Sequence, residues 1–195
     1  MKARHPITGM ALLILGLAAA APAQELTFSI GAGRFLASEG AYRQVYGSGP
    51  AFAGDIWLKL KGHLGLAAGF NLLPDRGMAV PMDGGDAAYP LKFRRTSIPL
   101  VVYYEFDVGD VAVRLGAGIG FHSYKEIWQT ADLEFEGHKV SPRIVLGVSW
   151  ALLDKLSLLF YANYDSIRTG AGSSLAKDVD LGGFQLLGGL AFRVF

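Results

Sequence analysis

Apolar residues alternate with small or polar residues along most of this chain. The pattern is clear from Leu100 to Phe106 and again from Val111 to Phe121, where every second residue is apolar. A period of two predicts extended strands that have one apolar face. Eight such segments occur, close in length to the roughly 9 to 11 residues that a tilted strand needs to cross a bilayer. Their ranges are 26–32, 52–60, 64–72, 98–106, 111–121, 144–152, 158–164 and 184–194.

The connections between these segments alternate between short and long. The short ones are residues 61–63, 107–110 and 153–155, and the long ones are residues 36–51, 73–97, 122–143 and 165–183. Bacterial outer-membrane barrels have this arrangement, with short periplasmic turns and longer extracellular loops. If the apolar residues stay on one face across the short turns, three pairs are predicted: Leu60 with Leu64, Phe106 with Val111, and Leu152 with Leu156.

The face opposite the apolar row consists of small residues rather than charged ones. In the segment 111–121 it includes Gly116, Gly118 and Gly120. The small row is predicted to line the lumen and the apolar row to face lipid, because a narrow eight-stranded barrel has room inside only for side chains. Serine would then fit at Gly116 or Gly118, whereas leucine would crowd the lumen. A soluble secreted barrel, such as a lipocalin, is the alternative, and it would need charge on that face.

The composition agrees with an apolar protein whose hydrophobic residues lie in short pieces. Of the 195 residues, 51% are hydrophobic and 26 are glycine, and the mean hydropathy is +0.32. The body of the chain has no apolar run of the roughly 20 residues that a membrane helix needs. The chain has no cysteine, which excludes disulfides, thiolate metal sites and a lipoprotein anchor.

The first 23 residues have the features of a cleavable signal peptide. Lys2 and Arg4 give a positive start, residues 10–20 are apolar, and residues 21–23 offer small side chains to a signal peptidase. The predicted domains are a signal peptide at residues 1–23 and a barrel at residues 24–195. The mature chain keeps 16 basic and 17 acidic side chains, so no basic field points to a nucleic-acid partner.

The chain resembles the small OmpA/OmpX-type proteins of the outer membrane protein β-barrel domain family. The resemblance rests on the signal peptide, on Ile98-Pro99-Leu100, on the glycine-rich residues 116–120 and on the terminal Phe195. It implies an all-β fold, an eight-stranded antiparallel up-and-down transmembrane barrel, in the outer membrane of a Gram-negative-type bacterium. It also implies that Phe195 helps the barrel-assembly machinery to recognise the last strand, although the residues at alternate positions before it, Arg193 and Ala191, depart from the usual apolar pattern.

Charged residues with lumen-facing parity suggest a polar network inside the barrel. These residues are Asp55, Lys59, Glu105, Arg114, Asp165 and Arg193. Buried charges must be paired, and Glu105 and Arg114 are predicted to lie diagonally across one hairpin. The simpler interpretation is that Asp55, Lys59, Glu105 and Arg114 fill and fix the lumen. The alternative is a small gate for ions or solutes.

Metal and catalytic chemistry have little support in the sequence. His63, His122 and His138 do not have metal-ligand spacing, and no two of them are two or four residues apart, so neither a metal nor a cofactor is predicted. The pair His122-Ser123 resembles the catalytic pair of barrels that deacylate lipid A. Neighbouring strand residues point to opposite faces, however, so the contact between base and nucleophile should fail.

The basic residues Lys92, Arg94 and Arg95 are predicted to contact lipopolysaccharide phosphates at the outer rim. The expected partners are therefore outer-membrane lipids, lipopolysaccharide and, during insertion, the barrel-assembly machinery. The expected protein is a monomeric outer-membrane barrel with a structural, surface-interaction or membrane-integrity role and no catalysis. A narrow passive channel is the first alternative, and a lipid A-modifying enzyme is the second.

Overall fold

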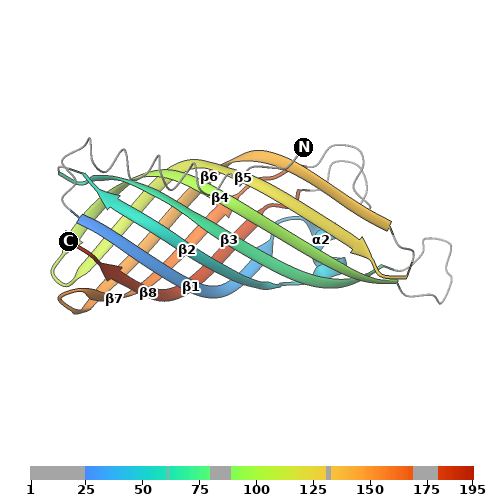
Figure 1. The fold of residues 1–195 in the computed structure, drawn as a ribbon, viewed down its shortest axis with the longest axis horizontal. Coiled ribbons are helices and arrows are strands. Elements are labelled where there is room, and N and C mark those ends of the chain that lie inside the picture. The colour runs from blue at the N-terminus through green and yellow to red at the C-terminus, as the bar shows by residue number, and fades with distance from the viewer. Residues whose placement is uncertain (1–24, 61, 80–88, 131–132, 169–179) are drawn as a thin grey trace, which may run out of the picture.

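The computed structural model describes residues 25–60, 62–79, 89–130, 133–168 and 180–195, which form one closed antiparallel barrel of eight strands (Figure 1). Each strand pairs with its neighbours in sequence, and the last pairs with the first, so the predicted up-and-down barrel is confirmed. The predicted signal peptide lies outside the described residues. The strands are β1 (Glu25–Ala37), β2 (Pro50–Lys59), β3 (Leu64–Ala79), β4 (Tyr89–Val108), β5 (Val111–Trp128), β6 (Leu133–Leu153), β7 (Leu156–Asp165) and β8 (Gly183–Arg193).

The outer wall of the barrel carries the apolar rows, as the alternation predicts. Val102 on β4 and Leu115 on β5 are 55% and 52% exposed, while Tyr103 and Glu105 between the outward positions are almost fully buried. The same alternation continues around the barrel. An apolar band on the outside and polar groups within suit a barrel that spans hydrocarbon, and they do not suit a soluble barrel.

The turn between β2 and β3 has the predicted pairing. The Leu60 amide donates to the Leu64 carbonyl oxygen at 2.8 Å. The turn between β6 and β7 differs from the prediction, because a bulge shifts the register and pairs Leu153, rather than Leu152, with Leu156.

The turn between β4 and β5 is tighter than predicted. Val108 pairs with Val111 around a two-residue turn, so Phe106 faces Val113 instead of Val111. Gly109 has a φ of 62°, a left-handed conformation that glycine adopts without steric cost. The shift is two residues, and both predicted faces are therefore preserved.

Two of the predicted long loops are mainly strand. Residues 73–79 pair with residues 89–95, and residues 122–128 pair with residues 133–139, which extends two hairpins beyond the apolar band (Figure 1). In this extension the pattern reverses, because Phe93 is buried and Arg94 is exposed. The outward face there meets water instead of hydrocarbon. The rows of outward apolar residues therefore end before the strands do, and the predicted strands were too short.

The glycine row of β5 faces inward as predicted, but the reason for it differs. A β-carbon at Gly118 would overlap the carbonyl oxygen of Leu100 on the neighbouring strand. At Gly116 it would lie 2.7 Å from a methyl carbon of Val101. Close approach of the backbone, rather than a shortage of lumen space, therefore requires glycine at residue 118, and the expected tolerance of serine there is wrong.

A short helix closes the barrel at the end opposite the short turns. Helix α2 (Gly40–Tyr46) follows β1, and its Tyr42 ring contacts Phe35 and Phe93 edge-on, with centroids 5.8 Å and 5.5 Å apart. The apolar cluster around them also contains Tyr46, Leu73, Leu91, Ile167 and Leu181, all buried. We refer to α2 and this cluster as the cap.

Candidate functional site

An ion cluster occupies the lumen near the short turns. Glu105 on β4 is its centre: Lys59 Nζ lies 2.6 Å from Oε1, and Arg114 Nε lies 2.5 Å from Oε2. Glu105 and Arg114 are directly opposite in the ladder, not diagonal as predicted. The Arg114 guanidinium also lies over the Trp57 ring, 5.0 Å from its centroid. Three of the four residues in the predicted network are therefore brought together.

Asp55 is the fourth residue, and it does not join this cluster. It lies four residues before Lys59 on β2, which corresponds to about 13 Å along a strand. Its carboxylate accepts a hydrogen bond from the Tyr161 hydroxyl at 2.9 Å. The cavity beside Asp55, between Trp57 and Arg143, has a volume of about 10 Å³ and holds at most one water molecule. The middle of the lumen is consequently packed.

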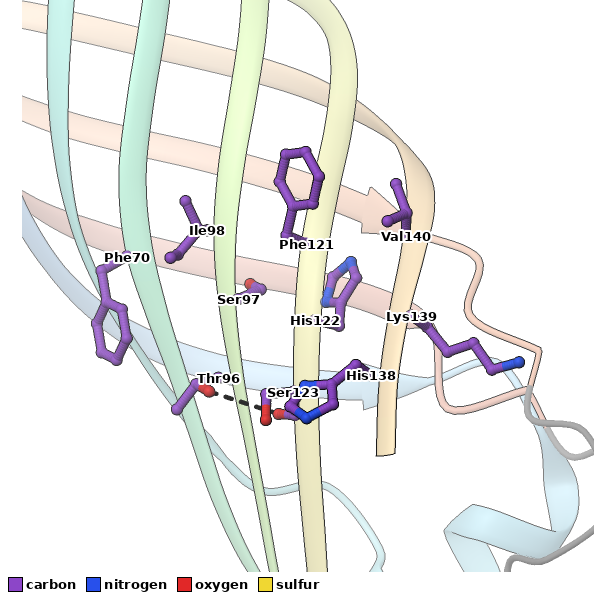
Figure 2. A pocket seen from close by; sticks show the side chains of 10 residues that line it. All are labelled: Phe70, Thr96, Ser97, Ile98, Phe121, His122, Ser123, His138, Lys139 and Val140. Atoms are coloured by element: carbon purple, nitrogen blue, oxygen red, sulfur yellow. Dashed lines mark hydrogen bonds between the residues drawn. The ribbon is translucent and has the colours of Figure 1, made fainter. Parts of the chain in front are cut away.

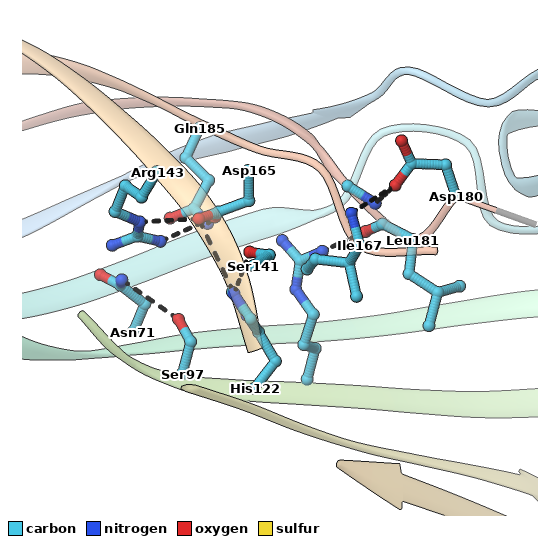
Figure 3. Close-up of polar contacts among 12 residues, drawn as sticks. Asn71, Ser97, His122, Ser141, Arg143, Asp165, Ile167, Asp180, Leu181 and Gln185 are labelled. Atoms are coloured by element: carbon cyan, nitrogen blue, oxygen red, sulfur yellow. Dashed lines mark hydrogen bonds and ion pairs between the residues drawn. The ribbon is translucent and has the colours of Figure 1, made fainter. Parts of the chain in front are cut away.

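A second polar cluster crosses the lumen closer to the cap (Figure 3). Asp165 on β7 accepts two hydrogen bonds from Arg143 on β6, from Nε and Nη2, each at 2.8 Å. Gln185 on β8 donates to the same carboxylate at 3.2 Å. The Asn71 amide from β3, with its oxygen turned toward Arg143, accepts from Nη1 at 2.6 Å. The cluster thus ties four strands together across the barrel.

Sequence reasoning named Asp165 but missed its partner Arg143. Residue 143 was placed at the end of a predicted loop, although its odd number gives it the lumen-facing parity of β6. The signal was therefore present, but it was hidden because the strand was expected to begin one residue later.

His122 does not form a catalytic site with its neighbours. Ser123 is on the opposite face of β5, as predicted, and His122 contacts Ser141 on β6 instead, with Nε2 2.8 Å from Oγ. The Asp165 carboxylate is 3.8 Å from the same nitrogen. A hydrolytic triad needs serine and acid on different ring nitrogens. Both contacts here use Nε2, Nδ1 has no hydrogen-bond partner among the described residues, and all three side chains are buried.

The three basic residues predicted at the outer rim divide between the two faces of β4. Lys92 and Arg94 are outward and exposed. Arg95 is inward and 1% exposed; it donates to the Leu181 carbonyl oxygen and lies 4.5 Å from the centroid of the Phe35 ring. Its predicted contact with lipopolysaccharide is wrong, because alternate strand residues point to opposite faces.

Residues 9–192 match the family described as "Outer membrane protein beta-barrel domain". The chain belongs to this family. Its fold is similar to OprG from Pseudomonas aeruginosa (12% identity, TM-score 0.71, covering 89% of this chain and 97% of OprG). It is also similar to Neisserial surface protein A (19% identity, TM-score 0.59, covering 86% of this chain and 96% of that protein). A third similar fold is Ail of Yersinia pestis (11% identity, TM-score 0.53, covering 89% of this chain and 99% of Ail). No curated protein matches the chain.

Membership of the outer membrane protein β-barrel domain family fixes the orientation of the barrel. Proteins of this kind place the short turns in the periplasm and the longer connections outside the cell. The cap and the two extended hairpins are therefore extracellular, and β8 ends on the periplasmic side (Figure 1). Phe195 follows β8 there and accepts a hydrogen bond from the Leu26 amide at 3.1 Å. Its role as an assembly signal stays a prediction.

Two further observations describe the residues that the structure covers. Within these ranges, no three histidine or acidic side chains are close enough together to hold a metal ion. No helix in the same ranges is long and apolar enough to cross a membrane.

The cap contains a carboxyl group that makes its packing depend on pH. Burial against α2 raises the pKa of Asp75, and this outweighs the hydrogen bond that Asp75 accepts from the Tyr42 hydroxyl at 3.1 Å. The folded cap therefore binds the proton more strongly than an exposed carboxyl, whose pKa is about 3.9. Glu126 has a raised pKa in the same region, also because of burial. Both groups favour the packed cap at low pH.

We expect cap packing to weaken as the pH rises from about 4 through the raised pKa of Asp75. Hydrogen exchange of the α2 amides, corrected for intrinsic rates, should show less protection at pH 7 than at pH 4. Asp75→Asn should reduce this difference, because the amide carries no charge at either pH. Asp154→Asn, at an exposed periplasmic turn, is the matched control and should change nothing. Equal pH dependence in both variants would contradict the assignment to Asp75.

Proposed function

We propose that this protein is a non-conducting outer-membrane barrel that holds a sheet extension above the outer leaflet for structural or surface-interaction roles. The observation that carries this proposal is the filled lumen. The Glu105 cluster, the packed middle and the Asp165 cluster follow one another along the barrel, and the cap lies above them. A solute would have to break several buried ion pairs to pass.

A larger internal space lies at the periplasmic end. It has a volume of about 280 Å³ between residues such as Glu25, Lys59 and Arg193. The Glu105 cluster forms its inner wall, so this space is a vestibule and not a pore. A passive channel is therefore the weaker candidate.

The extracellular side supports a role in surface interaction. From Phe121 to Trp128, β5 continues for about 20 Å of strand beyond the apolar band, paired on both sides. Side chains on its inner face pack into the cap, and Tyr124 and Trp128 contact the apolar cluster. Such a supported sheet offers a rigid surface at the cell exterior.

Planar-bilayer recording tests the proposal. The refolded wild-type protein should show no steady conductance, and Glu105→Ala should remain closed because the Asp165 cluster and the cap still fill the lumen. Stable single-channel steps in the wild type, altered by Glu105→Ala, would support the gate instead. For the enzyme alternative, the masses of lipid A from cells that express the protein should be the same as those from cells that do not.

A further inference from the structure

A groove hollows the outer wall of the barrel over β3 to β6 (Figure 2). The groove has a volume of about 760 Å³ and is lined on its outward side by Phe70, Thr96, Ile98, Phe121, Ser123, His138 and Val140. Ser97, His122 and Lys139, which lie on one cross-strand row of lumen-facing parity, also line it. We refer to it as the wall groove.

The local strand pairing explains why the wall is hollow there. The β3–β4 ladder pairs Ala68 with Leu100 and resumes at Asn71 with Ser97, so Phe70 and Ile98 are not paired with each other, although each pairs with its other neighbouring strand. Pro99 lies in this gap and has no amide hydrogen to donate to a neighbouring strand. The short side chains of Thr96 and Ser123 on the adjacent strands add to the depression.

The groove lies where the outer wall changes from apolar to polar. Three cross-strand rows succeed one another toward the extracellular side. They are Ile98–Phe121–Val140, then Thr96–Ser123–His138, and then Arg94–Lys125–Glu136. The first row is aliphatic and aromatic, the second carries hydroxyl and imidazole groups, and the third is charged. A ligand that matches this order has an acyl chain, a polar sugar or glycerol unit, and a charged group.

The charge at the polar end of the groove favours an anionic ligand. No carboxylate is among the described residues that line the groove, and the exposed, outward-facing Arg94 is next to it. Lys125 forms an ion pair with Glu134, but among the described residues no carboxylate forms an ion pair with Arg94. Arginine binds phosphate through two parallel hydrogen bonds.

The position of the groove identifies the source of such a ligand. The extracellular boundary of an outer-membrane barrel meets the outer leaflet, in which the acylated and phosphorylated glycolipid is lipopolysaccharide. We propose that the wall groove binds one acyl chain of lipopolysaccharide along Ile98 and Phe121, with a lipid A phosphate held by Arg94. This proposal concerns the outer wall only, so it stands or falls separately from the closed lumen.

Native mass spectrometry of the full-length barrel, refolded and released from detergent, tests the proposal with purified lipid A, phosphatidylglycerol and phosphatidylcholine as probes. We expect one lipid A to remain bound, with at least about tenfold preference over phosphatidylcholine, equivalent to about 1.4 kcal/mol. Ile98→Trp should fill the groove and lower lipid A occupancy about tenfold. Ile30→Trp, at an outward position on β1, is its matched control and should bind as the wild type does.

The phosphate contact has its own variant and control. Arg94→Glu should remove the preference for lipid A while leaving the weaker binding of phosphatidylcholine. Arg34→Glu, which reverses an exposed outward charge on β1, should keep the preference. Heat-modifiable migration on gels shows that each variant is folded before it is scored. Undiminished lipid A binding by folded Ile98→Trp, or equal binding of lipid A and phosphatidylcholine by the wild type, would overturn the proposal.

Discussion

Arginine in place of Leu115 should weaken the insertion of the barrel into a bilayer. The Leu115 side chain is 52% exposed on the outer wall, in the middle of the apolar row of β5. A cation at the bilayer midplane on the lipid face costs about 2 to 4 kcal/mol. We expect a correspondingly lower free energy of folding into bilayers, measured by urea titration and by heat-modifiable migration on gels.

The control for this prediction introduces arginine at another depth of the outer wall. Ser123 also faces outward on β5, but it lies in the polar row next to the extracellular surface. Ser123→Arg should therefore cost about 0 to 1 kcal/mol, as lipid-facing arginines near the interface do. If both variants lose the same amount of stability, or if Leu115→Arg folds as the wild type does, then the apolar row does not face hydrocarbon.

Alanine in place of Asp165 should destabilise the barrel by about 3 to 5 kcal/mol, since removal of one partner leaves an uncompensated buried charge. Arg143 would lose both hydrogen bonds to the carboxylate, and Gln185 would lose its acceptor. The buried Arg95 guanidinium would also lose its neighbouring negative charge. The midpoint of urea unfolding, followed by tryptophan fluorescence in detergent or bilayers, measures the effect.

Two variants separate burial from loss of charge as the cause. Glu134→Ala removes the partner of Lys125 in a half-exposed ion pair and should cost less than about 1 kcal/mol. Changing Asp165 and Arg143 together to leucine should recover part of the loss, because the Arg143 guanidinium is then no longer left as an unpaired buried charge. A double variant less stable than Asp165→Ala would show that shape, and not charge, governs this part of the lumen.

The sequence alone was sufficient to identify the barrel and its two faces. Hydrocarbon tolerates few polar side chains, so every spanning strand must present an apolar residue at each second position. The apolar rows that end at Phe106 and begin at Val111 therefore predict membrane-spanning strands from their alternation alone, whatever the secondary-structure propensity of single residues. The same parity placed Glu105 and Arg114 in the lumen. Short and long connections in alternation then gave the orientation, which family membership supports.

Only the tertiary structure decided how the residues of one face meet one another. Whether a residue number is odd or even predicts which side of the barrel wall its side chain faces. It predicts neither the position of the side chain along the barrel axis nor its contacts across the lumen. Asp55 and Lys59 share a face and lie in different layers, whereas Arg143 and Asp165 come from different strands and form a bidentate ion pair. The stagger of the strands in the closed barrel sets these positions along the axis, and it cannot be predicted from the sequence of any single strand.

The extracellular half shows the same limit for another reason. Beyond the bilayer the outer face meets water, so apolar residues no longer mark it: Phe93 and Arg95 lie inside while Arg94 lies outside. The wall groove depends on a missing pair beside Pro99, and the glycine at residue 118 depends on the approach of the Leu100 carbonyl. Each of these features results from contact between two strands. The sequence by itself determined which face of each strand meets lipid, and packing between strands determined what those faces form.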